Sequence, residues 1–297
     1  MQDATGALRI QGRRQDHIPK SGDTVRIRGK LQGEYVPSLG MKSVDLTDVE
    51  VTITGRARVP NAERRAIVSL FFDTALQEFI RVETEGIVRA ARKHGDRIIL
   101  ELAQDGYPLP VTIHSAADAD PQTFLDTRVV VRGVIRRTYD ENSQSTTRVE
   151  DFPPEMFVAS LQDVAMGERA PAGAEYVASI HDLVADPQWV SRGHRIRIRG
   201  RVVATDAERV LLIGKNGIVI PVETHQAQEF SVGELVEAMG WPTRRRFTIT
   251  LQRARIAHAE EPANEPSNEL RASLPVLTSI SAIRALPADE ANRAYPV

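Results

Sequence analysis

Aromatic residues stand beside basic residues at three places in the chain. An aromatic face next to a guanidinium group can stack on a nucleobase or a sugar ring while the cation holds an anion. These places therefore predict a ligand-binding surface. In a second interpretation the rings close the ends of a barrel and the basic groups contact water. The residues are Tyr35 near Lys30, Arg136 and Arg137 near Tyr139, and Trp241 near Arg244, Arg245 and Arg246.

Four arginines alternate with other residues in the stretch "RIRIRGR", residues 195–201. Successive side chains of a strand point to opposite faces, so the arginines share one face and the isoleucines share the other. Arg197 and Arg199, at the centre of the run, are candidates for a basic stripe that follows the phosphates of a nucleic acid. The alternative is cross-strand pairing with Glu or Asp, in which each exposed pair contributes about 0 to 1 kcal/mol.

Catalytic and metal-binding patterns are absent from the sequence. The chain has no cysteine, which excludes disulfides, zinc–thiolate sites and cysteine nucleophiles, and its seven histidines are scattered. It contains neither the Gly-x-Ser-x-Gly elbow of hydrolases nor a phosphate-binding glycine loop followed by Lys and Ser or Thr. We therefore expect a protein that is not an enzyme and that needs no cofactor or metal.

Composition describes an ordinary globular protein, with 41% hydrophobic and 26% charged residues. The net charge is -2, from 38 Lys and Arg against 40 Asp and Glu, so any nucleic-acid binding would need local basic patches. No apolar run approaches the roughly 18 residues that cross a bilayer.

The elements that would position these residues recur along the chain. Three series of glycines and serines keep one order and nearly one period, which indicates repeated structural units. The series are Gly6, Gly106 and Gly217, then Gly29, Gly133 and Gly240, and finally Ser69, Ser179 and Ser279.

Each unit reads as a short helix, a long strand, a hairpin, a polar crossover and two further strands. Asp105-Gly106 and Asn216-Gly217 supply the positive torsions of tight hairpin turns. Gly86 and Gly200 interrupt the long strands, where a closing barrel needs a bend or bulge. The sequence thus predicts a mainly β protein of tandem OB-fold-like five-stranded barrels joined by short helices. A generic meander or sandwich is the alternative.

Four units follow from this pattern. We expect an incomplete unit with only its third to fifth strands at residues 1–60, a second unit with its leading helix at 61–168, and a third at 174–260. Residues 261–297 would hold a linker, a helix and the start of another first strand. The first unit should then have an exposed strand edge that is able to pair with another strand, by self-association for example.

The two ends of the chain, "QDATGALRI" and "LTSISAIRALPADEANRAYPV", together with "IRIRGRVV", resemble the extracytoplasmic region of bacterial membrane-bound sensor histidine kinases. The resemblance implies a periplasmic sensing module of a two-component receptor, of which this chain would be a segment. Its partners would be the rest of the receptor and a small-molecule, sugar or peptide ligand.

Three functions are therefore open from the sequence. The first is non-enzymatic ligand sensing or presentation in a periplasmic receptor. The second is an OB-fold array, cytoplasmic in location, that binds single-stranded nucleic acid. The third is a structural spacer without a ligand.

Overall fold

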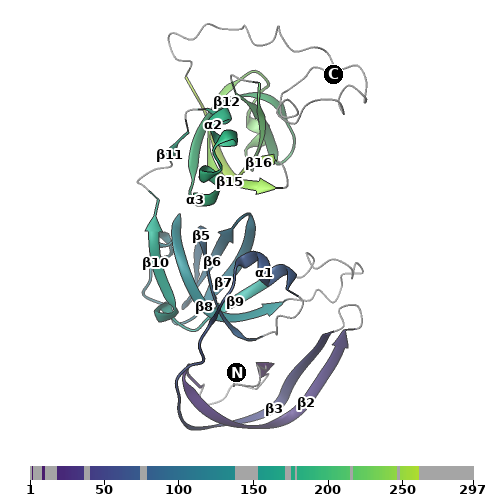
Figure 1. The fold of residues 1–297 in the computed structure, drawn as a ribbon, viewed down its shortest axis with the longest axis vertical. Helices are drawn as coiled ribbons and strands as arrows, with labels where there is room; N and C mark the ends of the chain where they lie inside the picture. Colours follow the sequence, from purple (N-terminus) through teal and green to yellow (C-terminus); the bar gives the residue numbers. More distant parts are fainter. Residues whose placement is uncertain are drawn as a thin grey trace. The chain divides into compact units, whose positions relative to one another are not determined.

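The computed structural model describes residues 2, 9–10, 19–36, 41–73, 79–137, 153–170, 175–177, 179–214, 217–245 and 248–260. The chain divides into two compact units, Met1–Glu168 and Arg169–Val297. The first unit contains a three-stranded and a seven-stranded sheet, and the second contains a six-stranded sheet (Figure 1). The predicted fourth unit, residues 261–297, lies outside the described residues.

The seven-stranded sheet closes into a five-stranded barrel, which we call barrel A. Its strands follow the order β5-β6-β7-β9-β8, and β8 returns to pair with β5. The pair β7–β9 is parallel, whereas the other four pairs are antiparallel. This is the strand order of an OB fold. The elements are β4 (Glu63–Arg64), α1 (Ile67–Phe72), β5 (Arg81–His94), β6 (Arg97–Gln104), β7 (Tyr107–Ile113), η2 (Pro121–Thr123), β8 (Thr127–Arg137), β9 (Pro154–Val158), η4 (Leu161–Asp163) and β10 (Val164–Arg169).

The six-stranded sheet repeats the same pairing in barrel B. Its order is β12-β13-β14-β16-β15, with β15 closing on β12 and only β14–β16 parallel within the barrel. The predicted fold class of tandem OB-like barrels is therefore confirmed. The elements are β11 (Glu175–Tyr176), α2 (Ile180–Ala185), α3 (Gln188–Arg192), β12 (Ile196–Thr205), β13 (Arg209–Ile213), β14 (Val219–Glu223), η5 (Ala227–Glu229), β15 (Leu235–Arg245) and β16 (Thr248–His258).

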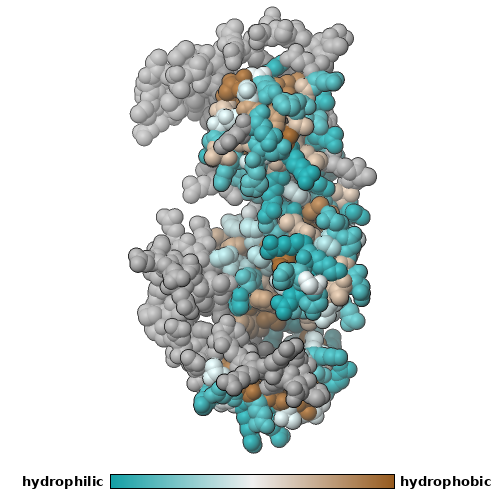
Figure 2. Space-filling model, turned by 180° about the vertical axis from the view of Figure 1, so that it is seen from behind, coloured by the Kyte–Doolittle hydropathy of each residue, from teal (hydrophilic) through white to brown (hydrophobic). Residues whose placement is uncertain are grey.

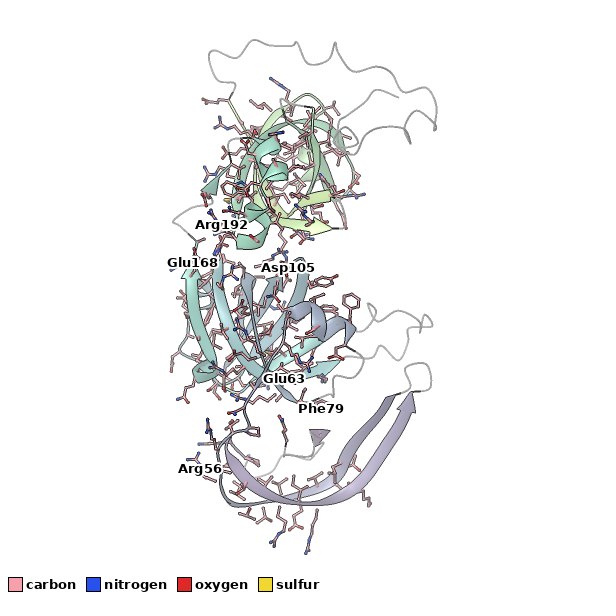
Figure 3. The ribbon with its side chains drawn as sticks, viewed as in Figure 1. Arg56, Glu63, Phe79, Asp105, Glu168 and Arg192 are labelled. Carbon is pink, nitrogen blue, oxygen red and sulfur yellow. The ribbon has the colours of Figure 1, made fainter. Side chains whose placement is uncertain are left out.

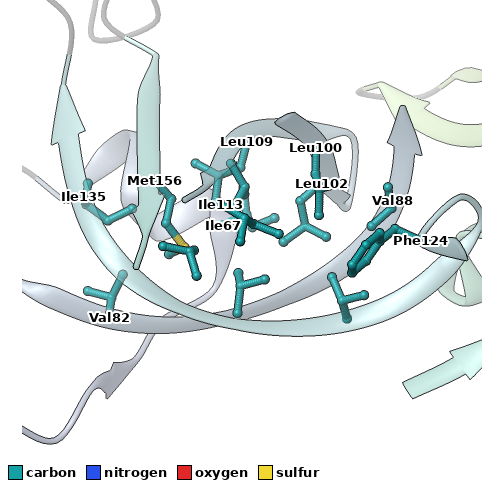
Figure 4. Close-up of a cluster of buried hydrophobic side chains, with 14 of the residues drawn as sticks. Ile67, Val82, Val88, Leu100, Leu102, Leu109, Ile113, Phe124, Ile135 and Met156 are labelled. Carbon is teal, nitrogen blue, oxygen red and sulfur yellow. The ribbon is translucent and has the colours of Figure 1, made fainter. Parts of the chain in front are cut away.

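Each barrel has its own apolar core. Alternate residues of the strands point inward, as in β8, where Val129 and Val131 are 0% exposed. The leading helix adds Ile67, labelled in Figure 4, and also Leu70 to the core of barrel A, and both are 0% exposed. Full burial of one such side chain stabilises the fold by about 1.5 to 3 kcal/mol. The two separate clusters explain why the chain forms two compact units.

Two local predictions about backbone geometry are confirmed. Asp105 and Gly106 have φ angles of 51° and 87° in the hairpin between β6 and β7, as a type I′ turn requires, and Figure 3 labels Asp105 at this turn. In β5 the pairing register with β6 shifts between Val88 and Ala90, just after Gly86. In β12 the pairing register with β13 shifts between residues 202 and 204, which likewise begins two residues after a glycine, Gly200.

The serine series does not mark equivalent positions in the two helices. Ser179 is the N-cap of α2, where its Oγ accepts a hydrogen bond from the backbone N–H of Asp182 at 3.0 Å. The N-cap of α1 is Ala66, and Ser69 lies inside that helix. Ile67 and Ile180, each the first helical residue and fully buried, are the equivalent pair. The serine alignment is therefore wrong by about one helical turn.

The three-stranded sheet has the connectivity of the last three barrel strands. Strand β1 (Arg9–Ile10) pairs in parallel with β3 (Met41–Arg56), and β2 (Asp23–Val36) pairs antiparallel with β3 on its other side. A Cβ added at Gly29 of β2 would lie 2.7 Å from Leu46 Cδ2 and 2.9 Å from Thr47 O. The same close approach to the last strand occurs at Gly133 and Gly240. Strand β2 thus corresponds to β8 and β15.

Candidate recognition surface

Trp241 lies on the outer face of barrel B but is covered by other parts of the chain. Its side chain is only 6% exposed, and the guanidinium carbon of Arg195 lies 5.4 Å from the ring centroid. A ring in this position cannot act as an open stacking platform. The cation–π contact instead stabilises the start of β12 against β15.

A polar chain extends beside Trp241 across β15, β16 and β14. The Thr243 hydroxyl donates to Gln252 Oε1 at 3.0 Å, and Gln252 Nε2 donates to Glu223 Oε2 at 3.2 Å. Thr243 is 1% exposed and Gln252 is 8% exposed. Sequence reasoning missed Gln252 and Glu223. The signal that could reveal them is the strand register, because Gln252 lies directly opposite Trp241.

In barrel A the corresponding region carries different side chains. Arg136 Nη2 donates to Glu155 Oε2 at 2.9 Å, and its guanidinium carbon lies 5.1 Å from the centroid of the Phe157 ring. The His114 ring lies 6.3 Å from the same aromatic ring. Partial burial lowers the pKa of His114, and the nearby positive charge of Arg97 lowers it further. The group is therefore a neutral polar neighbour of the aromatic ring near neutral pH.

The arginine run of β12 follows the predicted alternation. Ile196 and Ile198 are 2% and 0% exposed, so the arginines lie on the outer face. Arg197 Nη1 lies 3.4 Å from Glu237 Oε1, and Arg199 Nε lies 3.3 Å from Glu237 Oε2. One glutamate of β15 thus pairs with both arginines. This is the cross-strand alternative, and it reduces the positive charge that this face offers to a phosphate backbone.

The remaining predicted residues are only partly described. Arg244 is exposed near the end of β15. Lys30 on β2 pairs with Asp48 at 2.8 Å, which raises the pKa of the lysine and lowers that of the aspartate. Tyr35, Arg137 and Arg245 lie in β2, β8 and β15 with side chains outside the description, and Tyr139 and Arg246 lie outside the described residues.

Equivalent outward positions can be matched between the barrels from Gly133, Gly240 and the strand registers. By position in the repeat, Val134 corresponds to Trp241, Phe157 to Gln252 and Thr112 to Glu223. The inward neighbours Met156 and Leu251 are both apolar, at 1% and 0% exposure. The repeat therefore keeps the core chemistry and changes the chemistry of the outer face.

The described ranges hold neither a metal-binding cluster nor a membrane-spanning helix. These residues include no group of three or more His, Asp or Glu side chains that could hold a metal ion. None of the helices within them is both long and apolar enough to span a membrane.

Comparison with known proteins gives distant structural similarity alone. No family model and no curated protein matches the chain. An engineered OBody, AM3L09, bound to hen egg-white lysozyme is 13% identical, covers 37% of this chain and 100% of its own, and has a TM-score of 0.26. An asparaginyl-tRNA synthetase of Entamoeba histolytica is 16% identical over 46% of this chain and 32% of its own, with a TM-score of 0.30. A murine DNA-binding protein bound to double-stranded DNA is 13% identical over 62% and 99%, with a TM-score of 0.24.

Proposed function

We propose that this chain is a non-enzymatic recognition region of a bacterial signal-transduction receptor, built from tandem OB-like barrels. The observation that carries the proposal is the repeated frame with changed outer faces. Equivalent outward positions hold Val134 and Phe157 in barrel A, and Trp241 and Gln252 in barrel B. A repeat that keeps its core and changes the outward side chains of its strands is suited to making different contacts with different units.

The ion-pairing of the outer face supports recognition of a small polar ligand, a sugar or a peptide. Arg197 and Arg199 share Glu237, and Arg136 contacts Glu155. Glu155 offsets the charge of Arg136 and Glu237 offsets one of the two charges of Arg197 and Arg199, so this face offers less positive charge to a long polyanion. The polar chain of Thr243, Gln252 and Glu223 bonds within the barrel, so it holds this part of the outer face together.

The receptor part of the proposal rests on the resemblance of the two ends of the chain to sensor kinases, which implies a periplasmic location. Antibodies against the barrels should detect the native protein in the inner-membrane fraction of the source cells. Protease added to spheroplasts should digest the barrels, while a cytoplasmic marker protein in the same sample stays intact. Recovery of the native protein in the cytosolic fraction would overturn this location and the receptor role.

A second candidate, binding of single-stranded nucleic acid, is favoured by one observation. Arg244 is exposed beside the loop between β15 and β16, and two further arginines follow it in the sequence. Three phosphate contacts would give a slope of about -2 in a plot of log affinity against log salt. Fluorescence anisotropy with a labelled single-stranded oligonucleotide measures that slope. Absence of binding at low ionic strength removes this candidate.

A further inference from the structure

One edge of β2 pairs with no other described strand, although its counterparts in both barrels are paired on that side. Residues Arg128–Val134 of β8 pair with β5, and Leu235–Gly240 of β15 pair with β12. Strand β2 occupies an edge of its sheet, and no other described strand pairs with that side. An unpaired edge of this length presents a row of backbone N–H and C=O groups to an incoming strand.

The inward face of the same sheet also lacks the cover that closed barrels have. Val25 and Ile27 correspond to Val129 and Val131 of β8, which are 0% exposed. In the sheet of β1 to β3 both residues are only half-buried, and Ile53 on β3 is 44% exposed. No hydrophobic side chain described in this sheet is fully buried. Figure 2 shows hydrophobic residues, in brown, among the hydrophilic ones on the surface of the molecule. A strand with apolar inward residues would cover this face and gain hydrophobic stabilisation.

The positive charge on the outward face of β2 indicates which residues an incoming strand should carry. Arg26 and Arg28 are exposed, and neither forms an ion pair with any described residue. In barrel A the position of Arg28 is taken by Arg132, which pairs with Glu83 of β5 at 2.7 Å. A strand with acidic residues at alternate positions would therefore match Arg26 and Arg28 across the new ladder.

Pairing between two copies of β2 is disfavoured by the same residues. In an antiparallel pair centred on Ile27, Arg26 of each copy lies opposite Arg28 of the other. Shifting the register by two residues in either direction still places basic side chains opposite one another. Like charges that lie directly opposite destabilise a strand pair.

We propose that the edge of β2 binds an extended segment of a separate polypeptide in which acidic outward residues alternate with small or apolar inward residues. The expected pairing is antiparallel, with acidic residues opposite Arg26 and Arg28 and an inward residue opposite Ile27. This inference goes beyond the proposed function, because it concerns a backbone edge of the first sheet and not the outer faces of the two barrels.

The chain itself contains a suitable test sequence. The strand at residues 81–90, "RVETEGIVRA", pairs with β8 and places Glu83 opposite Arg132. On β2 the same register would place Glu83 opposite Arg28 and Glu85 opposite Arg26. A labelled synthetic peptide of this sequence should bind the full chain in an anisotropy titration. Hydrogen exchange should then show new protection in residues 24–29.

Charge-reversed variants decide whether the binding is at β2. Arg26→Glu/Arg28→Glu should weaken peptide binding by at least about tenfold, because two favourable pairs become repulsive. The same change at exposed barrel residues, Arg92→Glu/Arg255→Glu, should leave binding within about twofold. A peptide carrying Glu83→Lys and Glu85→Lys should bind the Arg26→Glu/Arg28→Glu chain better than the original chain.

Three results would overturn the proposal. The first is no peptide binding at millimolar concentration, and the second is binding that is unchanged in the Arg26→Glu/Arg28→Glu variant. The third is a dimer of the chain, seen by light scattering, in which residues 24–29 are already protected without peptide. All three are independent of where the native protein is located, so failure here is distinguishable from failure of the receptor proposal.

Discussion

Gly240→Ala should destabilise barrel B by a measurable amount. An added Cβ would lie 2.8 Å from Gln252 O, 2.9 Å from Leu251 Cγ and 3.1 Å from Ala254 Cα. Two of these atoms belong to the backbone of β16, so the clash cannot be relieved by a side-chain rotation. Overpacking of this kind costs about 1 to 3 kcal/mol, and the lower entropy of the unfolded Ala variant offsets about 0.4 to 1 kcal/mol. These ranges allow a net loss of up to about 2.6 kcal/mol, and contact with backbone atoms that cannot rotate away favours about 1 to 2 kcal/mol.

The chain provides a selective assay for this loss. Both tryptophans, Trp189 and Trp241, lie in barrel B, so their fluorescence reports its unfolding. With a urea m-value of about 1 kcal/mol/M, the midpoint should fall by about 1 to 2 M. Gly133→Ala is the matched control, because its Cβ would lie 2.6 Å from Phe157 O in barrel A. It should lower the stability seen by circular dichroism and leave the tryptophan transition unchanged.

An unchanged tryptophan midpoint in Gly240→Ala would refute the close approach of β15 to β16. A shift of that midpoint in Gly133→Ala would instead refute the independence of the two cores. The pair of variants therefore tests both the equivalence of the glycines and the division into separate units.

Three further predictions concern the outer faces. Trp241→Ala should cost about 3 to 5 kcal/mol of barrel B stability, because only 6% of this residue is exposed. Denaturant unfolding followed by circular dichroism measures the loss. A loss under about 1 kcal/mol would show that the ring is exposed. Glu237→Gln should cost at most about 1 kcal/mol, with an effect that shrinks in high salt, and an effect insensitive to salt would contradict its ion-pair role. The pKa of His114 in the folded state lies below the ordinary value of 6.5 that the unfolded chain has. Barrel A should therefore lose stability as the pH falls from 6.5 toward that lower pKa, because the unfolded chain binds the proton first. His114→Asn should flatten this slope, and an unaltered slope would contradict the assignment.

Local backbone signals in the sequence predicted much of the fold. The Asp105-Gly106 turn and the glycines within the long strands depend on torsion and close approach, which residue type alone can indicate. The helix alignment failed because a distant contact helps to set where α1 begins. The backbone N–H of Ile67 donates to Gln104 Oε1 at 2.8 Å, and no pattern local to the helix contains that information.

The ion pairs and the burial of the candidate site residues were harder to predict, because they depend on how the barrel closes. Glu237 reaches Arg197 and Arg199 only because β15 pairs with β12 across the closing seam. Burial of Trp241 likewise depends on Arg195, which comes from the start of another strand. Sequence alternation places each of these side chains on the outer face, but it does not say which neighbour covers it.

The different outer faces of the two barrels bear on whether one barrel can replace the other in binding. Barrel A presents Phe157 where barrel B presents Gln252, and Thr112 where barrel B presents Glu223. Since the frames match and the outward side chains differ, a substitution that impairs binding at one barrel should not be compensated by the other barrel.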